Sequence, residues 1–370
     1  MNNINYEIYE GELTVITPIH IGDGSKISKK EYLIEDSIIY IFDFEKLYNA
    51  FYVQGREAED EFTDFLLKTN PTKSLKDLLE EYRVIYQNCA SYKIQNSGFE
   101  ENNFNIMTYI KDAYGNPYVP GSSIKGFIKT AIISYSIYKN DDVLSKIKNK
   151  INDALFKMKN KINDALYKKY CFKELDEYIT KEVENVLRLQ DLNPFSGLII
   201  SDSEPINKNS LCIAGKYDKS CKNKEKKINI YKESLSPNVN VKFMLTLDKS
   251  KIKIDINFIK EALVFYNSQI NKYFLNEFGV ENSNDNFIFV GGGSGFPTKT
   301  IIYQIYGEEA KKITWKIFKK NFPIKMFEKH KDMEGKVTPH MRKCTKFKDK
   351  DGRIKTDDIG KALISFNRKQ

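Results

Sequence analysis

Four glycines in five residues, directly after a short apolar run, restrict the folding of this chain more than any other feature. The run Phe287–Val290 predicts a buried strand, and Gly291–Gly295 follows it. Glycine adopts backbone conformations that a Cβ forbids, so several N–H groups of such a loop can converge on one point. Pro297 stands where a helix can begin, with Thr298 and Lys299 in its first turn. The pattern predicts a site for an anion such as phosphate.

Spacing separates this loop from two familiar nucleotide-binding loops. A P-loop requires glycine immediately before its lysine, whereas Thr298 precedes Lys299. A dinucleotide-binding fingerprint requires a third glycine three residues after the second, where this chain has Phe296 or Thr298. Two interpretations remain open, a phosphate cradle and a glycine-rich hairpin or bulge without a ligand.

Positive charge is concentrated in one segment. The formal net charge of the 370 residues is +9. Residues 311–350 hold fourteen Lys and Arg against four Asp and Glu, so this segment carries +10 and the remainder −1. Such a segment is typical of a footprint for a polyanion, and the alternative is a solvated lysine surface.

Composition argues against several other classes. No segment approaches the ~20 consecutive apolar residues that cross a bilayer, and the first six residues lack the parts of a secretion signal. Five scattered cysteines without a Cys-x-x-Cys, and three histidines, argue against a disulfide framework and a zinc site. Asp202 lacks a second carboxylate at metal-ligand spacing, so we expect it in a turn or a helix cap. We predict a cytoplasmic protein with no cofactor, no metal and no membrane partner.

Strand and helix signals predict an α+β fold. The strand signals lie at 13–16, 32–34, 38–41, 104–110, 197–202, 211–214, 228–231 and 239–245, the last three forming a second sheet. Helical periodicity covers 44–87, 122–138, 140–190 and 258–278. Because strands are grouped rather than strictly alternating with helices, we expect two split βαββαβ modules. Their predicted bounds are 1–205 and 206–370, with helical insertions at about 44–90 and 140–190 in the first.

A short duplication lies in the second insertion. Residues 148–157 recur as 159–168 with one substitution. Eleven residues make about three helical turns, so we expect one elongated helix rather than a solenoid. The apolar residues expected on its common face are Ile151, Leu155, Ile162 and Leu166.

The loop after the first strand, 17–24, holds His20 close to Gly22 and Gly24. A histidine at a strand end is able to act as a general base or to bond a phosphate oxygen. The alternative is a partly buried structural residue, because two isoleucines flank this histidine.

A second stretch of small residues suits a helix start. Gly121, Ser122 and Ser123 leave N–H groups accessible, with Ser122 or Ser123 as the N-cap. Lys125 and Lys129 follow one turn apart on a single face. This pattern also predicts anion binding, and the alternative is a capped helix with exposed lysines.

Together and in this order, three loops resemble those of the repeat-associated mysterious proteins (RAMP), the RNA-binding superfamily of CRISPR systems. They are residues 17–24, 118–126 and 291–300. Within the superfamily, chain length, the helical insertions, residues 200–203 and the tail 338–343 resemble the fifth Csm subunits of type III-A effector complexes.

The resemblance implies two ferredoxin-like modules of the RNA-recognition-motif type. It implies a subunit that caps the complex beside the backbone subunit, holds the 3′ part of the CRISPR RNA, and supports its maturation through host 3′-trimming nucleases. The residues that we predict to contact RNA are His20, Gly22, Gly24, Gly121, Ser122, Ser123, Lys125, Lys129, Gly291, Gly292, Gly293, Gly295, Lys299, Arg342 and Lys343.

The leading hypothesis is therefore a non-catalytic RNA-binding subunit acting in antiviral defence. Basic groups at glycine-rich loops suit a sugar–phosphate backbone, and some of the 47 tyrosines and phenylalanines offer stacking platforms for bases. The alternative is a metal-independent endoribonuclease that uses His20 to process CRISPR RNA. A third hypothesis is a nucleotide-binding enzyme built on the glycine loop.

Overall fold

The computed structural model describes residues 6–69, 71–96, 105–159, 165–187, 193–222, 224–280, 287–321, 336–349 and 351–369. The strands are β1 Tyr6–Val15, β2 Gly22–Ile27, β3 Tyr32–Glu35, β4 Ile38–Phe42, β5 Ala90–Gln95, β6 Ile106–Tyr109, β7 Leu198–Ile200, β8 Leu211–Ser220, β9 Glu225–Leu235, β10 Asn240–Asp248, β11 Phe287–Phe289, β12 Met341–Lys348, β13 Ile354–Asp358 and β14 Lys361–Arg368. The helices are α1 Phe44–Tyr52, α2 Arg56–Leu67, α3 Leu75–Glu81, α4 Gly121–Tyr138, α5 Asp141–Lys159, α6 Ala165–Leu187, α7 Ile256–Tyr273, α8 Ile302–Tyr306 and α9 Ala310–Asn321. The predicted α+β class is confirmed.

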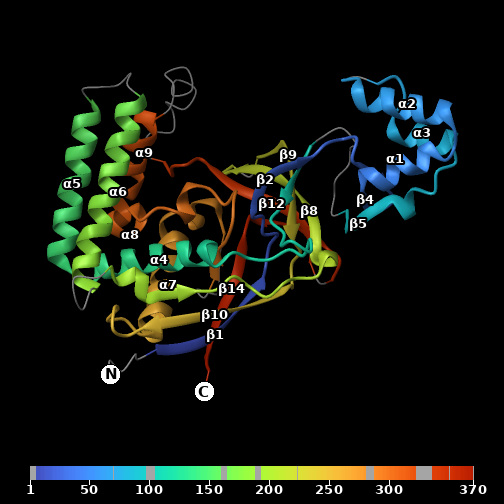
Figure 1. The fold of residues 1–370 in the computed structure, drawn as a ribbon. Coiled ribbons are helices and arrows are strands. Elements are labelled where there is room, and N and C mark those ends of the chain that lie inside the picture. Colours follow the sequence, from blue (N-terminus) through green and yellow to red (C-terminus); the bar gives the residue numbers. More distant parts are fainter. Residues whose placement is uncertain are drawn as a thin grey trace.

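An antiparallel five-stranded sheet, in the order β11-β14-β1-β10-β7, supports one half of the molecule (Figure 1). The strand β1 is central because it pairs with β10 along one edge and β14 along the other. Residues of β1 alternate, so Leu13 and Val15 are buried in the core. The helices α4 and α7 pack on this sheet, where Phe127 contacts both Tyr266 and Phe289.

A second sheet runs β2-β6-β9-β8-β5-β4-β3, and β12 extends from β8 with β13 beside it. The prediction that 211–214, 228–231 and 239–245 share one sheet is wrong. β8 and β9 pair here, whereas β10 crosses into the first sheet and pairs with β1. Both sheets also combine strands from before and after residue 205.

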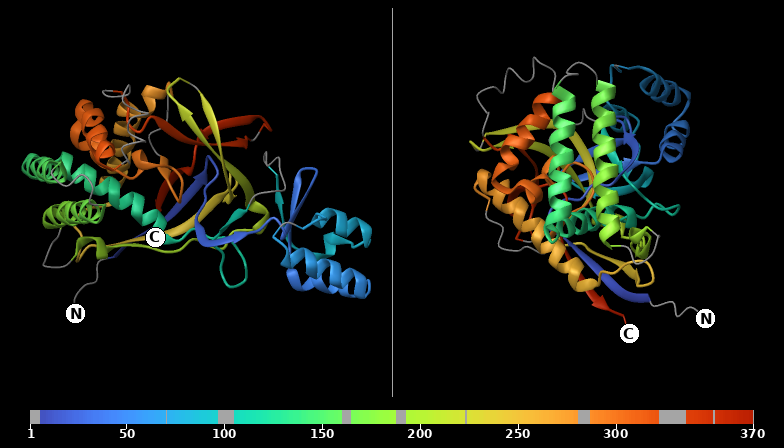
Figure 2. Two further views of the ribbon diagram at one scale, coloured as in Figure 1. Left: turned by 90° about the horizontal axis from the view of Figure 1, so that it is seen from above. Right: turned by 90° about the vertical axis from the view of Figure 1, so that its left-hand side faces the viewer.

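The helices α1 to α3 form a small module at one end of the molecule, carried by β3, β4 and β5 (Figures 1 and 2). It has its own apolar cluster, in which the rings of Phe51 and Phe62 stack with centroids 4.3 Å apart. Ser74 begins α3 with a reciprocal capping box to Asp77. The helical signal at 44–87 is thereby confirmed.

The duplicated segment does not lie in the single elongated helix that the sequence predicted. It begins in α5 and ends in α6. The helices α5 and α6 lie side by side at the other end of the molecule (Figures 1 and 2). Ile151 and Leu155 of α5 are buried in the main apolar core, as an amphipathic face predicts. Ile162 and the side chain of Leu166 lie outside the described residues.

Candidate nucleic-acid interface

The glycine loop lies where the two sheets meet. The N–H of Gly292 donates to the carbonyl of His20 at 2.8 Å, and the N–H of Gly360 donates to the carbonyl of Pro18 at 3.1 Å. A Cβ on Gly291 would lie 2.1 Å from the His20 carbonyl oxygen, and its φ is 83°. Gly291 therefore allows the loops 17–21 and 291–295 to touch through their backbones, joining two of the predicted motifs.

The residues after the loop do not form the predicted α-helix start. Phe296–Thr298 make one 3-10 turn, and α8 begins only at Ile302. The hydroxyl of Thr298 donates to Ser294 Oγ at 2.8 Å, which closes the turn on itself. Lys299 is exposed directly after this turn. Any anion at this loop must therefore be held by cationic side chains rather than by a helix N-terminus.

Lys232 approaches the loop, and two further lysines act on it through their charges. Lys232 of β9 places its Nζ 3.4 Å from the Gly292 carbonyl oxygen. Burial, followed by the charges of Lys216 on β8 and Lys299, lowers the pKa of Lys232. Burial and the charge of Lys343 lower the pKa of Lys216. Within the described residues no carboxylate lies at ion-pair distance from Lys216, Lys232 or Lys299, although the charge of Asp218 acts on Lys216 and partly opposes the fall in its pKa.

Sequence analysis identified Lys299 and missed Lys216 and Lys232. Both missed residues lie inside strands, outside every glycine motif. Their proximity to the loop depends on the pairing of β8 with β9, where Ala214 lies opposite Lys232. No local sequence signal identifies that arrangement. We define Lys216, Lys232 and Lys299 as the lysine cluster.

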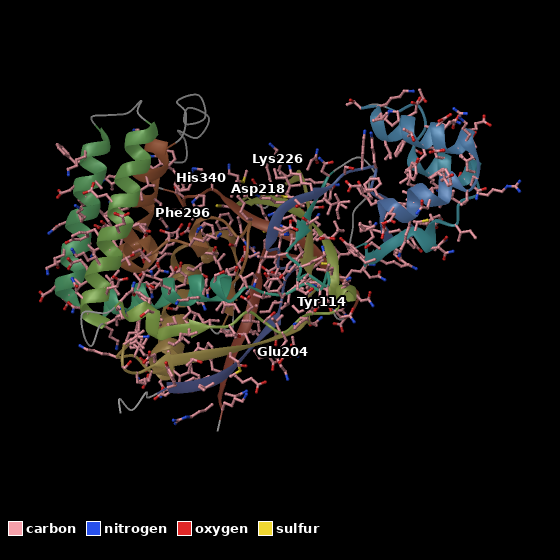
Figure 3. All side chains as sticks on the ribbon, in the orientation of Figure 1. Tyr114, Glu204, Asp218, Lys226, Phe296 and His340 are labelled. Carbon is pink, nitrogen blue, oxygen red and sulfur yellow. The ribbon has the colours of Figure 1, made fainter. Side chains whose placement is uncertain are left out.

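Arg342 and Lys343 of the basic segment 311–350 both have carboxylate partners. Lys343 packs against Gly295, but its Nζ bonds both carboxylate oxygens of Asp218, at 2.8 and 2.7 Å. The side chain of Arg342 is only 5% exposed and pairs with Asp357 and Asp358. Asp218 lies near Phe296 and His340, around one cavity (Figure 3). Arg342 therefore holds β12 to β13, and only Lys343 among the two predicted contacts reaches the loop.

Two further lysines of the segment also have carboxylate partners. Lys311 pairs with Glu277 at 2.5 Å, and Lys346 pairs with Glu225 at 3.0 Å. Both acids lie before residue 311 in the chain, so a count within the segment misses them. The +10 charge of residues 311–350 is therefore no measure of the positive charge left unpaired there.

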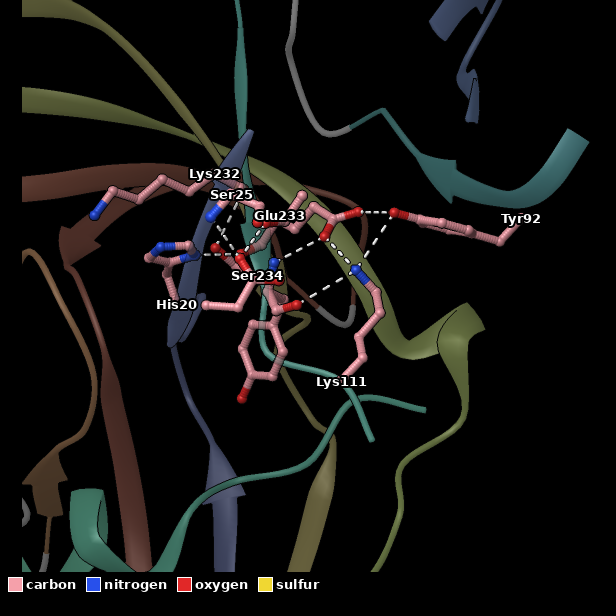
Figure 4. Close-up of polar contacts among 10 residues, drawn as sticks. His20, Ser25, Tyr92, Lys111, Lys232, Glu233 and Ser234 are labelled. Carbon is pink, nitrogen blue, oxygen red and sulfur yellow. Dashed lines mark hydrogen bonds and ion pairs between the residues drawn. The ribbon is translucent and has the colours of Figure 1, made fainter. Parts of the chain in front are cut away.

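His20 belongs to a buried polar network at the same junction (Figure 4). Its Nδ1 donates to the carbonyl of Glu233 at 2.7 Å, and the residue is 4% exposed. Burial lowers the pKa of His20 to about 4, so the ring is neutral near pH 7. The buried carboxylate of Glu233 accepts from Lys111 Nζ at 2.6 Å, from the N–H of Tyr109 at 2.8 Å and from the Tyr92 hydroxyl. This arrangement suits a structural anchor.

Gly22 and Gly24 differ in position. A Cβ on Gly22 would lie 2.9 Å from His20 Nε2, so this glycine leaves room for the imidazole. Gly24 is exposed with a φ of 94° and has open space around it, at an irregularity of the β2–β6 pairing. Only Gly22 is in contact with the junction of the two sheets.

The start of α4 differs from the prediction. Its N-cap is Pro120, without a side-chain cap, so neither Ser122 nor Ser123 has that role. The carboxylate of Asp202 accepts from the N–H of Gly121 at 2.8 Å, which confirms the predicted cap or turn role of Asp202. A Cβ on Gly121 would lie 2.3 Å from the carbonyl oxygen of Ile200, so the close approach of β7 requires glycine.

The α4 lysines both contact Phe195. Lys125 Nζ donates to the Phe195 carbonyl at 2.8 Å, and Lys129 Nζ lies 4.6 Å from the centre of the Phe195 ring. Burial, then the charge of Lys129, lowers the pKa of Lys125. Among the contacts of the described residues, α4 reaches the glycine loop region through Phe127 and Thr130 rather than through these lysines.

Comparison with known proteins identifies the family. The model of the RAMP superfamily matches residues 12–326. The chain belongs to the RAMP superfamily. A Streptococcus thermophilus relative, described as "CRISPR system Cms protein Csm5", is 31% identical over 319 residues, covering 82% of each chain. An Enterococcus italicus Csm5 is 25% identical over 362 residues, covering 85% of this chain and 86% of the relative. Within the RAMP superfamily, the chain is Csm5-like.

Solved structures share the fold. A chain in the cryo-EM structure of a Csm–crRNA–target RNA ternary complex has a TM-score of 0.64 at 19% identity, with 96% of this chain and 100% of that chain covered. The crystal structure of T. onnurineus Csm5 has a TM-score of 0.60 at 18% identity, with 95% and 99% covered. At these identities the likeness describes the RAMP fold alone.

Within the described residues no helix combines the length and apolarity that crossing a bilayer requires. The same part of the chain contains no group of three or more His, Cys, Asp or Glu side chains arranged to hold a metal ion.

Proposed function

We propose that this RAMP protein is the Csm5 subunit of a type III-A CRISPR effector complex and binds the 3′ part of the CRISPR RNA. The observation that carries the proposal is the lysine cluster, in which Lys232 approaches the glycine loop and feels the charges of Lys216 and Lys299, with no ion pair to any of the three among the described residues. The Csm5-like sequence supports the choice of complex. As part of the same proposal, the two sheets derive from ferredoxin-like modules of the RNA-recognition-motif type.

The charge arrangement favours a sugar–phosphate backbone as ligand. Mutual repulsion among Lys216, Lys232 and Lys299 is relieved when an anion lies between them, and the pKa of Lys232 then rises toward its ordinary value. A backbone places one phosphate on each nucleotide, so ammonium groups on separate elements can be satisfied together. Such contacts position RNA without reading its sequence, which suits a protein that holds many different guides.

A double variant tests the backbone site. Each lysine that neutralises a phosphate of single-stranded RNA contributes about 0.7 to the slope of log K against log salt concentration. We expect Lys232→Ala with Lys299→Ala to weaken RNA binding and to reduce that slope by about 1.4. The control is Lys76→Ala, an exposed lysine of α3 beside Glu80. Equal affinity and equal slope for wild type and double variant would disprove the assignment.

We propose that the chain is not itself a nuclease. Support comes from His20, whose burial and bond to Glu233 leave it neutral and enclosed. The test is incubation of the purified protein with CRISPR repeat RNA in EDTA. We expect no cleavage; cleavage by wild type that disappears in His20→Ala would establish the endoribonuclease alternative instead.

We further propose that this subunit caps the complex beside the backbone subunit and recruits host nucleases that trim the RNA 3′ end. The support is the family relationship. Tagged protein purified from its native cells should bring Csm subunits and CRISPR RNA with a common 3′ region. Recovery of unrelated RNA and no Csm subunit would refute this part of the proposal.

A further inference from the structure

A cavity of about 470 Å³ opens beside the glycine loop, within the range of about 300–1,000 Å³ for ligand pockets. Ser294–Thr298 of the loop line it, together with residues of α7, α9, β8, β9 and the start of β12. Phe296, His340, Asp218 and Lys226 gather in this region in Figure 3. The glycine loop links the cavity to the lysine cluster, because Ser294–Thr298 line the cavity and Lys232 Nζ lies 3.4 Å from the Gly292 carbonyl oxygen.

Aromatic rings dominate the lining. Phe296 and Phe318 meet edge to face with centroids 5.3 Å apart, and Trp315 and His340 are tilted with centroids 5.7 Å apart. Phe296 is half-buried, so part of its ring remains available. Rings of this kind bind flat heteroaromatic ligands by stacking, at about 1–3 kcal/mol for each base in single-stranded nucleic acid complexes.

One buried polar atom of the lining has no partner. Asp358 is 7% exposed, and its Oδ1 accepts from Arg342 Nε at 2.5 Å. Its Oδ2 has no hydrogen-bond partner. A buried acceptor without a partner is costly, so a ligand that donates an N–H to this oxygen gains affinity. A purely apolar ligand leaves the carboxylate unsatisfied.

Charge in the lining adds a preference for a phosphate. Lys343 is paired with Asp218, which also lines the cavity, whereas Lys226 has no ion pair among the described residues. A matching ligand has a flat ring, an N–H donor on that ring and a phosphate at one end. A nucleotide combines all three features.

We propose that this cavity binds one nucleobase of the bound RNA, turned out of the strand. The base stacks on Phe296 and Trp315 and donates an N–H to Asp358 Oδ2, while its phosphate lies toward Lys343 and the lysine cluster. The proposal rests on the proposed RNA binding and adds a base-holding site to it. A free nucleotide has the same chemistry, so the experiment separates the two sources.

Trp315 is the single tryptophan of the chain and reports the cavity directly. Its fluorescence is followed while full-length protein is titrated with three probes: a short RNA, an abasic strand of the same length, and nucleoside monophosphates. Fluorescence polarisation measures the affinity of both strands in parallel. We expect the RNA to change Trp315 emission and to bind about tenfold more tightly than the abasic strand.

Variants connect the signal to the cavity. Phe296→Ala should weaken RNA binding about tenfold and leave binding of the abasic strand unchanged. Asp358→Asn, which keeps the side-chain size, should also weaken RNA alone. The matched control is Phe156→Ala, because Phe156 is 67% exposed on α5 and does not line the cavity.

Each outcome decides a separate point. Equal binding of RNA and abasic strand, without a change in emission, overturns the base site and leaves backbone binding intact. Emission changes with nucleoside monophosphates but not with RNA assign the cavity to a soluble nucleotide and overturn the RNA-base proposal. If neither strand binds, the proposed function fails, and the monophosphate titration still shows whether the cavity accepts a base.

Discussion

Acidification is expected to destabilise this fold through His20. The unfolded chain binds a proton at this residue with a pKa near 6.5, whereas burial lowers the pKa in the folded state to about 4. Between those values the unfolded state holds more protons than the folded state. The contribution of His20 to the free energy of unfolding is therefore complete above pH 6.5 and is lost as the pH falls toward 4. From pH 7 to pH 5 the loss from His20 alone is about 2 kcal/mol, since each unit of difference is worth about 1.4 kcal/mol.

The matched variant is His20→Asn, because an amide in this position still donates to the Glu233 carbonyl and does not titrate. Urea unfolding followed by Trp315 fluorescence gives the free energy of unfolding of the main body at both pH values. Carboxylates that titrate elsewhere contribute equally to both proteins and cancel in the difference. Wild type should therefore lose about 2 kcal/mol more than the variant between pH 7 and pH 5.

A difference within about 0.5 kcal/mol would refute this reasoning. It would mean that His20 is solvated, or that it becomes protonated inside the folded protein at ordinary pH. Either result would also revive the histidine as a candidate general acid or base. The pH profile thus tests the structural assignment of His20 without depending on RNA.

Three further predictions concern stability. Gly291→Ala should lower the free energy of unfolding by about 2–4 kcal/mol in a urea titration, because the new Cβ meets the His20 carbonyl and the residue keeps a positive φ. The control Gly126→Ala lies in open space on α4 and should raise the free energy of unfolding by about 0.5–1 kcal/mol. Equal effects would contradict the packing at Gly291. Glu233→Ala should lower the free energy of unfolding by about 3–5 kcal/mol in the same assay, because it leaves the partly buried Lys111 without its partner. A loss below about 1 kcal/mol would mean that water replaces the carboxylate. Phe51→Ala should melt α1 to α3, seen as lost helical circular dichroism and faster proteolysis there, with RNA affinity unchanged; weaker RNA binding would place that module in the interface.

Local patterns were enough to predict the element types of this chain. Apolar periodicity predicted the helices at 44–87 and 258–278 because amphipathic spacing is a property of neighbouring residues. The run of glycines at 291–295 likewise indicated backbone conformations that a Cβ forbids, and Gly291, Gly293 and Gly295 have positive φ. The resemblance of three loops was sufficient to predict the RAMP superfamily.

Charge compensation and the composition of the lysine cluster depended on tertiary structure alone. Asp218 neutralises Lys343 across 125 residues of sequence, and strand pairing brings Lys232 to the glycine loop. Such contacts follow from which strands pair and in which register, and that choice minimises the free energy of the whole core rather than of any segment. The sequence by itself determined that this chain has strands, helices and a loop that only glycine can form. Only the fold decided which lysines near that loop lack an ion pair, because a partner such as Asp218 for Lys343 lies 125 residues away in the sequence.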